Sequence, residues 1–540
     1  MIVRYSVFLI ILFFVYSCNP GNPKDTSNKF LKVEGQNFVD AEGREVILSG
    51  INFISKEPSE KYMPAQGEET FKQFNAWGFN CIRLGIIWDG LEPEPGKYNE
   101  AYLQEIDKRI KWAEKNDLYV FLDMHQDLYG TQFSDGAPDW ATITNDQPHY
   151  KGEVWSDSYL ISPAVQTAFD NFWNNAPAPD GIGLQDHYAN LWKLIAERYA
   201  KNATVIGYDV MNEPFMGSEA QNVLPMMLGA YAQVYVEVTG EAPPSAEELA
   251  AIWGSEASRM EALNMISTRD RYSKVVDAVY EVSAAFEKNK LQPFYQKVAD
   301  AIREVDMHHI LIYNHNYFVN TGVSTALEAT KLPDGSRDPQ VAYGAHGYDL
   351  VVDTKENENQ SRERVEFIFD RVAESGKRMN MPVLLGEWGA LHSKSEKMVE
   401  TAQHLVGIIE AHKFSNTFWA YYGNIDEYPF FQQAIVRPYP QRISGKLDFY
   451  DYNFETGEFT FVWEESGKEQ EPSVIYVPVL SNLTEEDIAT SPAADQIVFE
   501  HCEDSGGGRL LVSPLGKPMK RTLRFKIHLT SGKEFTINKS

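Results

Sequence analysis

The sequence has few cysteines and a shortage of positive charge. Only Cys18, Cys81 and Cys502 occur among 540 residues, which is too few for a disulfide framework and lacks the paired spacing of a zinc site. Lys and Arg number 49 against 77 Asp and Glu, giving a formal net charge of −28. A field of that sign repels phosphate groups. It therefore argues against nucleic-acid binding and against electrostatic docking on anionic lipid.

An apolar run near the N-terminus is too short to cross a bilayer. Arg4 is followed by ten apolar residues, Val7 to Tyr16, about half of the roughly 20 that a membrane helix needs. Such a run fits the core of a signal peptide, and the Ser-Cys pair at its end resembles the lipobox of bacterial lipoproteins. We expect residues 1–17 to be removed, Cys18 to be lipidated and residues 18–29 to be a polar tether. An ordinary secretory signal with an incidental cysteine is the alternative.

This interpretation predicts an exported protein. The lipid on Cys18 would tether it to the outer membrane of a Gram-negative bacterium, facing either the periplasm or the cell surface. The sequence does not distinguish the two faces.

Eight short apolar runs alternate with amphipathic stretches along the middle of the chain. The runs cover 46–52, 80–88, 118–125, 204–212, 309–314, 341–346, 381–387 and 416–421. Helical patterns between them include 68–77, 101–115, 184–200, 362–378 and 394–413. This alternation predicts a parallel sheet, and eight strands are the number in a (β/α)8 TIM barrel. A doubly wound open sheet is the alternative, but no glycine-rich phosphate loop follows the first strand.

Two parts of the chain depart from this alternation. Residues 215–304 are too long for an ordinary connection between a strand and the next helix, and must hold additional helices. After Tyr439 the helical patterns stop, and short strand-like segments are separated by Gly, Pro, Asn and Asp, as in antiparallel sandwiches. We therefore predict an α/β protein: a TIM-barrel domain over 30–437, with that insert, and a C-terminal β-sandwich domain over 438–540.

Two glutamates end predicted strands at the expected mouth of the barrel. Glu213 follows the fourth strand in an Asn-Glu-Pro sequence, and Glu387 ends the seventh in a Leu-Gly-Glu-Trp-Gly sequence. Active sites of TIM barrels lie at this end of the strands. Two facing carboxylates suffice for glycoside hydrolysis, because one protonates the leaving oxygen and the other attacks the anomeric carbon. Either glutamate alone could instead cap a helix or form an ion pair.

The ordered set of strand-end residues resembles glycoside hydrolase family 5 of the retaining TIM-barrel clan. The resemblance implies that Glu213 is the general acid/base and Glu387 the nucleophile, with no metal or organic cofactor. The other residues that carry it are Arg83, Asn212, His346, Tyr348 and Trp419.

Elementary chemistry fits these additional residues. Asn212 can bind the sugar 2-hydroxyl, and Tyr348 and Arg83 can donate hydrogen bonds to Glu387. Trp419 offers an apolar face to the sugar. Structural roles remain open for three of the set: a barrel ion pair for Arg83, core packing for Trp419 and a satisfied strand-end histidine for His346.

A longer motif is more specific than the family pattern. The sequence DMHQDLY at 123–129, followed by GAPDW at 136–140, resembles the endoglycoceramidase branch of the family, as does Lys56 after the first strand. The resemblance implies that Lys56, His125 and Asp127 bind the glucose next to ceramide. It extends over roughly residues 30–540 but matches nothing residue by residue in the insert.

The start of the insert is unusually apolar. Residues 223–228 read VLPMML, and more apolar residues follow up to 236. They could form an apolar lip for the acyl and sphingoid chains of a lipid. A helix packed on the barrel is the alternative.

Together these features predict a monomeric, retaining β-glycosidase that hydrolyses the bond between oligosaccharide and ceramide in glycosphingolipids. A β-glucosidase acting on another glycolipid, such as a steryl glucoside, or an endo-β-glucanase are alternatives within the same chemistry. A non-catalytic glycan-binding surface lipoprotein is a more distant alternative, since a binding protein needs no acid/base pair.

Overall fold

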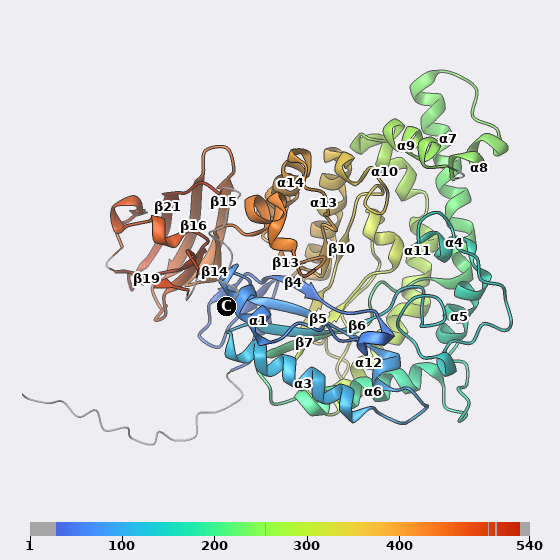
Figure 1. The fold of residues 1–540 in the computed structure, drawn as a ribbon, viewed down its shortest axis with the longest axis horizontal. Helices are drawn as coiled ribbons and strands as arrows, with labels where there is room; N and C mark the ends of the chain where they lie inside the picture. Colours follow the sequence, from blue (N-terminus) through green and yellow to red (C-terminus); the bar gives the residue numbers. More distant parts are fainter. Residues whose placement is uncertain (1–28, 254, 495, 503–504, 530–540) are drawn as a thin grey trace, which may run out of the picture.

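The computed structural model describes residues 29–529 apart from residues 254, 495, 503 and 504 (Figure 1). The predicted signal segment, Cys18 and the tether up to residue 28 lie outside the described residues. Within the described part of the chain, no helix is long and apolar enough to span a membrane.

The middle of the chain forms a barrel of parallel strands. Its eight strands pair in the order β11-β13-β4-β5-β6-β7-β8-β9. Their bounds are β4 (Ser49–Phe53), β5 (Cys81–Ile87), β6 (Tyr119–His125), β7 (Val205–Asp209), β8 (Ile310–Tyr313), β9 (Val341–Tyr343), β11 (Leu384–Leu385) and β13 (Ser415–Phe418). The ring closes where Tyr343 bridges Val383, and where β10 (His346–Gly347) pairs with β12 (Glu387–Trp388). The predicted TIM barrel is confirmed.

Amphipathic helices surround the barrel (Figure 1). They are α1 (Glu68–Ala76), α2 (Trp88–Leu91), α3 (Glu100–Lys115), α4 (Asp157–Ile161), α5 (Pro163–Trp173), α6 (Leu184–Tyr199), α13 (Arg362–Met379) and α14 (Glu396–His412). Helix α3 shows why such segments fold: Leu103, Ile106 and Ile110 recur on one face and are buried. Asn99 caps its start by accepting a hydrogen bond from the Tyr102 N–H.

The insert is helical, and its first helices lie at the corner farthest from the C-terminal domain (Figure 1). The helices are α7 (Val223–Thr239), α8 (Ala246–Trp253), α9 (Glu256–Met265), α10 (Arg269–Asp277), α11 (Tyr280–Phe286) and α12 (Gln292–Arg303). Helix α7 packs against α10 and buries Tyr231 and Val234. Leu224, Met226 and Met227 are only half-buried. The apolar segment therefore both packs on the protein and leaves one side accessible.

Two antiparallel sheets form the domain beyond the barrel, which confirms the predicted C-terminal antiparallel domain. One sheet has the order β1-β2-β3-β14-β17-β20-β19, and the other β15-β16-β21-β18. Bounds in the first are β1 (Lys32–Glu34), β2 (Asn37–Val39), β3 (Glu45–Val46), β14 (Tyr439–Ile443), β17 (Ser473–Val477), β20 (Gly508–Val512) and β19 (Ile497–His501). Bounds in the second are β15 (Lys446–Asn453), β16 (Glu458–Ser466), β21 (Pro518–Lys526) and β18 (Ala489–Ser491).

Strands β1 to β3 precede the barrel in sequence but belong to the C-terminal sheet. Val46 of β3 pairs with Arg442 of β14. The sequence-based prediction had included residues 30–46 in the barrel domain. The β1–β2 hairpin also closes the barrel floor, because Leu31 and Phe38 share a buried apolar cluster with Cys81 and Phe121 from the barrel strands. Above this apolar floor the barrel interior becomes charged, and the charged layer supports the site.

Candidate active site

Glu213 and Glu387 meet at the carboxyl ends of the barrel strands. One carboxylate oxygen of each lies within 4.8 Å of the other. The two residues are only 6% and 5% exposed. A separation near 5 Å is typical of retaining glycosidases, whereas inverting enzymes hold their carboxyl groups roughly 6.5–9.5 Å apart. The geometry is suited to double displacement.

Glu213 lies in a site that favours its neutral form. Burial, and next the negative charge of Asp127, raise the pKa of Glu213 from 4.5 to about 7. The Asn320 side-chain amide donates to Glu213 Oε1 at 2.6 Å, and His346 Nδ1 lies 2.8 Å from the same oxygen. A carboxyl group with this pKa carries a proton in much of the population near neutrality, as a general acid requires.

The backbone of Glu213 is held in the left-handed region, with φ of +40°, an uncommon conformation for a residue with a side chain. Its N–H donates to Asn314 Oδ1 at 3.2 Å, and its carbonyl accepts from Gln126 Nε2 at 3.2 Å. These bonds fix a strained backbone, and strain of this kind is concentrated at functional sites.

Glu387 receives two hydrogen bonds that stabilise its ionised form. Arg83 Nη1 donates to Oε1 at 2.6 Å, and the Tyr348 hydroxyl donates to Oε2 at 3.0 Å. Glu387 is therefore oriented by two donors, whereas burial favours the neutral form of Glu213. This asymmetry assigns different roles to the two glutamates.

Arg83 is fully buried and forms the charged layer beneath the glutamates. Its guanidinium contacts Asp209 Oδ2 at 2.9 Å and Asp123 Oδ1 at 2.9 Å in addition to Glu387. It also donates to Asn212 Oδ1 at 2.9 Å. A buried cation that binds several carboxylates at once cannot be removed without leaving uncompensated charge.

Asn212 precedes Glu213 in the chain, and His346 Nδ1 lies 2.8 Å from Glu213 Oε1 and 3.7 Å from Glu387 Oε2. Asn212 Nδ2 donates to the Gln126 carbonyl at 3.1 Å, and Asn212 Oδ1 accepts from Arg83. The two contacts fix the orientation of the amide. Burial lowers the pKa of His346 to about 3. His346 is therefore neutral, and Nδ1 can donate to Glu213 when that group is ionised or accept from it when it is protonated.

A second polar cluster adjoins the glutamates. Lys56 forms an ion pair with Asp127, and its ammonium lies 4.7 Å from the centre of the Trp419 ring. His125 stacks on Trp419 at 5.3 Å and bonds Asp123 Oδ2 at 2.8 Å. Burial alone would lower the pKa of His125, but the carboxylate of Asp123 raises it to about 10. The cluster thus presents cationic donors and one carboxylate acceptor around an aromatic ring, a set suited to sugar hydroxyls.

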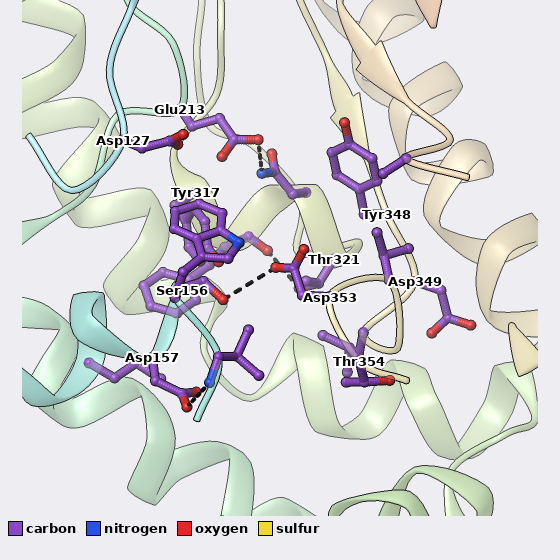
Figure 2. Close-up of a pocket in the computed structure, with 18 of the residues that line it drawn as sticks. Asp127, Ser156, Asp157, Glu213, Tyr317, Thr321, Tyr348, Asp349, Asp353 and Thr354 are labelled. Carbon is purple, nitrogen blue, oxygen red and sulfur yellow. Dashed lines mark hydrogen bonds between the residues drawn. The ribbon is translucent and has the colours of Figure 1, made fainter. Parts of the chain in front are cut away.

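The two clusters lie in one cavity of about 310 Å³ (Figure 2). Of the sequence-predicted residues, Lys56, His125, Asp127, Asn212, Glu213, Tyr348, Glu387 and Trp419 line it. Figure 2 shows the cavity continuing from Glu213 and Asp127 past Tyr317 towards Asp349 and Thr354. Polar groups, among them Asp157, Arg259, Asp349 and Asp353, line part of this continuation. Its apolar side chains are Val154, Leu160, Val223, Leu224, Met227, Leu263, Phe318, Val323, Leu350 and Val352. We call these ten residues the apolar arm.

Within the described residues, two sets of ligand atoms are close enough to hold a metal ion: one from His125, Asp127 and Asp135, the other from Glu213, His346 and Glu387. In the first set, the Lys56 ammonium already pairs with Asp127. The second set contains the two strand-end glutamates themselves. Neither has the sulfur or multi-histidine composition of a structural zinc site.

Sequence reasoning missed several residues that shape the site. Asp123 and Asp209 carried a usable signal, because a carboxylate inside an apolar strand is costly unless it is paired. Asn320 carried none: it lies in a short 3-10 helix, η6 (Tyr317–Thr321), after β8. Asp135 is fully buried beside Asp127, and burial raises its pKa to about 6.

Comparison with protein families agrees with this geometry. The family model described as "Cellulase (glycosyl hydrolase family 5)" matches residues 39–424. The chain belongs to glycoside hydrolase family 5. The family's C-terminal domain model matches residues 437–512. The protein is accordingly a glycoside hydrolase with the two domains that its sheets define.

The relatives that this family 5 enzyme resembles include endoglycoceramidases. The endoglycoceramidase of Cyanea nozakii is 33% identical over 215 residues, 34% of this chain and 41% of that protein. Endoglycoceramidase I of Rhodococcus hoagii is 30% identical over 199 residues, 36% of this chain and 39% of that protein. The chain thus matches less than half the length of these curated relatives.

Solved structures share the fold along most of the chain. Endo-glycoceramidase II from Rhodococcus sp., in a complex with ganglioside GM3, has a TM-score of 0.68 at 23% identity and covers 92% of this chain and 100% of that one. Sterylglucosidase 1 of Cryptococcus neoformans has a TM-score of 0.63 at 16% identity, covering 94% and 98%. At these identities the likeness establishes the fold alone.

Proposed function

We propose that this family 5 enzyme is a retaining β-glycosidase that releases the oligosaccharide from ceramide in glycosphingolipids. The observation that carries the proposal is one continuous cavity. It joins a pair of buried carboxylates and a polar sugar-binding cluster to the apolar arm. A simple polysaccharide hydrolase needs no apolar continuation beyond its acid/base residue. The endoglycoceramidases among the relatives support the same substrate class.

In the first step, Glu387 attacks the anomeric carbon and Glu213 gives its proton to the departing oxygen. The bond between that carbon and the aglycone oxygen breaks, a glycosyl–Glu387 ester forms, and the aglycone leaves as an alcohol. Arg83 and Tyr348 hold the attacking carboxylate in place. His346 holds the oxygen of Glu213 that is left ionised by the transfer.

In the second step, Glu213 acts as base. It takes a proton from water, whose oxygen attacks the anomeric carbon and displaces Glu387. Both glutamates return to their starting states, and the sugar keeps its β configuration. Each half-reaction leaves Glu213 in the protonation state that the other needs, so a pKa of about 7 serves both.

The experiment that tests the substrate class compares three natural glycosides side by side. A ganglioside, a steryl glucoside and a series of cello-oligosaccharides are incubated with equal amounts of enzyme. Preferred release of intact oligosaccharide from the ganglioside is the expected result. Preferred turnover of the steryl glucoside, or of the cello-oligosaccharides, would mean that the natural substrate is a steryl glucoside or a glucan and not a glycosphingolipid.

Variants of α7 test the apolar arm directly. Leu224 and Met227 line the cavity, whereas their neighbour Met226 does not. Leu224→Ser combined with Met227→Ser should weaken activity on ganglioside and spare a water-soluble aryl lactoside, because the soluble substrate makes no lipid contact. Met226→Ser is the matched control. Equal losses on both substrates would mean that these residues hold the fold instead.

Each apolar side chain fully covered by lipid is worth about 1.5–3 kcal/mol. Because Leu224 and Met227 are half-buried before any lipid binds, we expect about half of that from each. The double variant should therefore lose roughly tenfold or more in kcat/KM on ganglioside.

We also propose export and lipid anchoring through Cys18, a residue outside the described part of the chain. The proposal rests on Arg4, the apolar run after it and the Ser-Cys pair. Mass spectrometry of the membrane fraction should find a lipid-modified Cys18 as the first residue, and Cys18→Ser should lose both the lipid and the cleavage before residue 18. An intact, unmodified Cys18 would contradict the proposal.

A further inference from the structure

A second cavity, of about 370 Å³, adjoins the catalytic one. The two share Lys56, Asp127 and Trp155, but the second contains neither glutamate. Its size falls within the range of small-molecule sites, roughly 300–1,000 Å³. In the proposed function the apolar arm takes the aglycone, which leaves the second cavity for the glycan. A sugar chain that passes Lys56 and Asp127 would continue into it.

The walls of this cavity combine aromatic and polar side chains. Phe133 and His149 form one wall, with ring centres 4.9 Å apart, and Trp155 is 46% exposed. The exposed Ser134 supplies a hydroxyl group. Exposed aromatic faces beside a hydroxyl group match the apolar faces and polar edges of a sugar ring.

The charge of the cavity is opposite to that of the protein. Lys56 and Lys151 line it, and Asp127 is the one carboxylate among its lining residues. Asp127 already pairs with Lys56. Within the described residues, the Lys151 ammonium has no ion pair or hydrogen bond, even with nearby Glu153.

His149 adds no charge to the cavity. Its Nδ1 bonds Ser162 Oγ at 2.9 Å, and burial, then the charge of Lys151, lowers its pKa. Lys151 is therefore an uncommitted cation at the edge of a sugar-sized cavity in a chain of net charge −28.

We propose that the second cavity is a distal glycan subsite and that Lys151 selects a sugar bearing a carboxylate or a sulfate. The inference rests on the proposed function and extends it from the aglycone to the far end of the glycan. A substrate whose third sugar is anionic should bind better than its neutral counterpart, because the Lys151 ammonium can pair with the anionic group.

The test uses four substrates that carry the same soluble fluorogenic aglycone. They are a lactoside, a neutral galactosyl-lactoside, a sialyl-lactoside for the carboxylate and a sulfo-lactoside for the sulfate. Wild-type enzyme is compared with Lys151→Gln, with the conservative Lys151→Arg, and with Lys468→Gln as an exposed lysine control in the C-terminal domain. The measured quantity is the ratio of kcat/KM on each anionic substrate to kcat/KM on the neutral trisaccharide.

The wild-type ratio should exceed one for at least one anionic substrate. It should fall about fivefold in Lys151→Gln, the most that a partly exposed ion pair contributes. Lys151→Arg should restore it, and Lys468→Gln should leave it unchanged. The substrate with the higher ratio identifies carboxylate or sulfate as the preferred group. A wild-type ratio of one or less, or a ratio that Lys151→Gln does not change, would overturn the inference.

Failure of the proposed function would look different: the steryl glucoside or the cello-oligosaccharides would be preferred over the ganglioside, whatever the ratios on the four soluble glycosides. In that case, calorimetry with free sialyllactose, sulfolactose and lactose tests the subsite alone. Tighter binding of an anionic sugar to wild type, lost in Lys151→Gln, would support the subsite. Equal affinities would refute it.

Discussion

The pKa of Glu213 should set the alkaline limit of activity. Glu213 must be protonated to release the aglycone, and its pKa is raised from 4.5 to about 7, first by burial and then by Asp127. This rise corresponds to about 3 kcal/mol in favour of the neutral acid. At pH 8 about one-tenth of the enzyme would carry the proton, so kcat/KM should be about tenfold below its plateau.

The assay compares two lactosides across pH 5 to 9. One has a poor, alcohol-like leaving group, and the other a dinitrophenyl leaving group that departs without a proton. Only the first should lose kcat/KM as pH rises through about 7. Glu213→Gln should abolish turnover of the first substrate and spare the formation of the glycosyl ester from the second. The reasoning is refuted if both substrates show the same alkaline limb, or if that limb persists in Glu213→Gln.

The same pKa shift has a consequence for stability. The folded protein favours neutral Glu213, whereas the unfolded chain ionises this group near pH 4.5. This contribution is fully present below pH 4.5 and is lost as pH rises through about 7. Glu213→Gln should therefore be more stable than wild type at pH 8 by up to about 3 kcal/mol, with a smaller gain at pH 4. Urea unfolding at both pH values measures it, and a gain independent of pH would contradict the assignment.

Three further variants test the rest of the site. Glu387→Gln should reduce turnover of natural substrate at least about a hundredfold in a folded protein. In the wild type, NMR should show the β anomer of the released sugar first, and an α anomer would indicate inversion. Arg83→Met should destabilise the fold by about 3–5 kcal/mol, since it leaves the buried carboxylates of Asp123 and Asp209 without their cation. An unchanged urea midpoint would show that these two carboxyl groups are neutral in the folded protein. Asn320→Ala removes a donor to ionised Glu213, so the alkaline limb should move to higher pH, and a move to lower pH would mean that Asn320 stabilises the neutral acid.

The barrel could be predicted from the sequence because its signals are local. Each strand is a short apolar run followed by an amphipathic helix, and each catalytic candidate ends such a run. Glu213 and Glu387 follow this rule, as do His125 and Tyr348. Chain order then places all of them at one end of the barrel, where the structure also places them.

What the sequence could not show depends on contacts between distant segments. Asn320 reaches Glu213 from a 3-10 helix after β8, and no local pattern marks that position. The pairing of Val46 with Arg442 joins residues nearly 400 positions apart. The sharing of Arg83 among three carboxylates depends on tertiary structure: Asp123 and Asp209 lie on the two strands that follow β5 in the sheet, and the curvature of the barrel adds Glu387.

The sheet that contains β1 to β3 imposes an order on folding. As the chain is synthesised, β1 and β2 emerge first, but the edge of β3 has no partner until β14 appears, after the whole barrel has been made. The outer strands β17, β20 and β19 come later still. A barrel that formed before β14 emerged would have its floor attached to a half-built sheet. A truncation that ends after β13 would remove the strand that clamps the first segment of the chain in place. It would leave the barrel with an unpaired β-edge directly beneath its core, a template for association with other nascent chains.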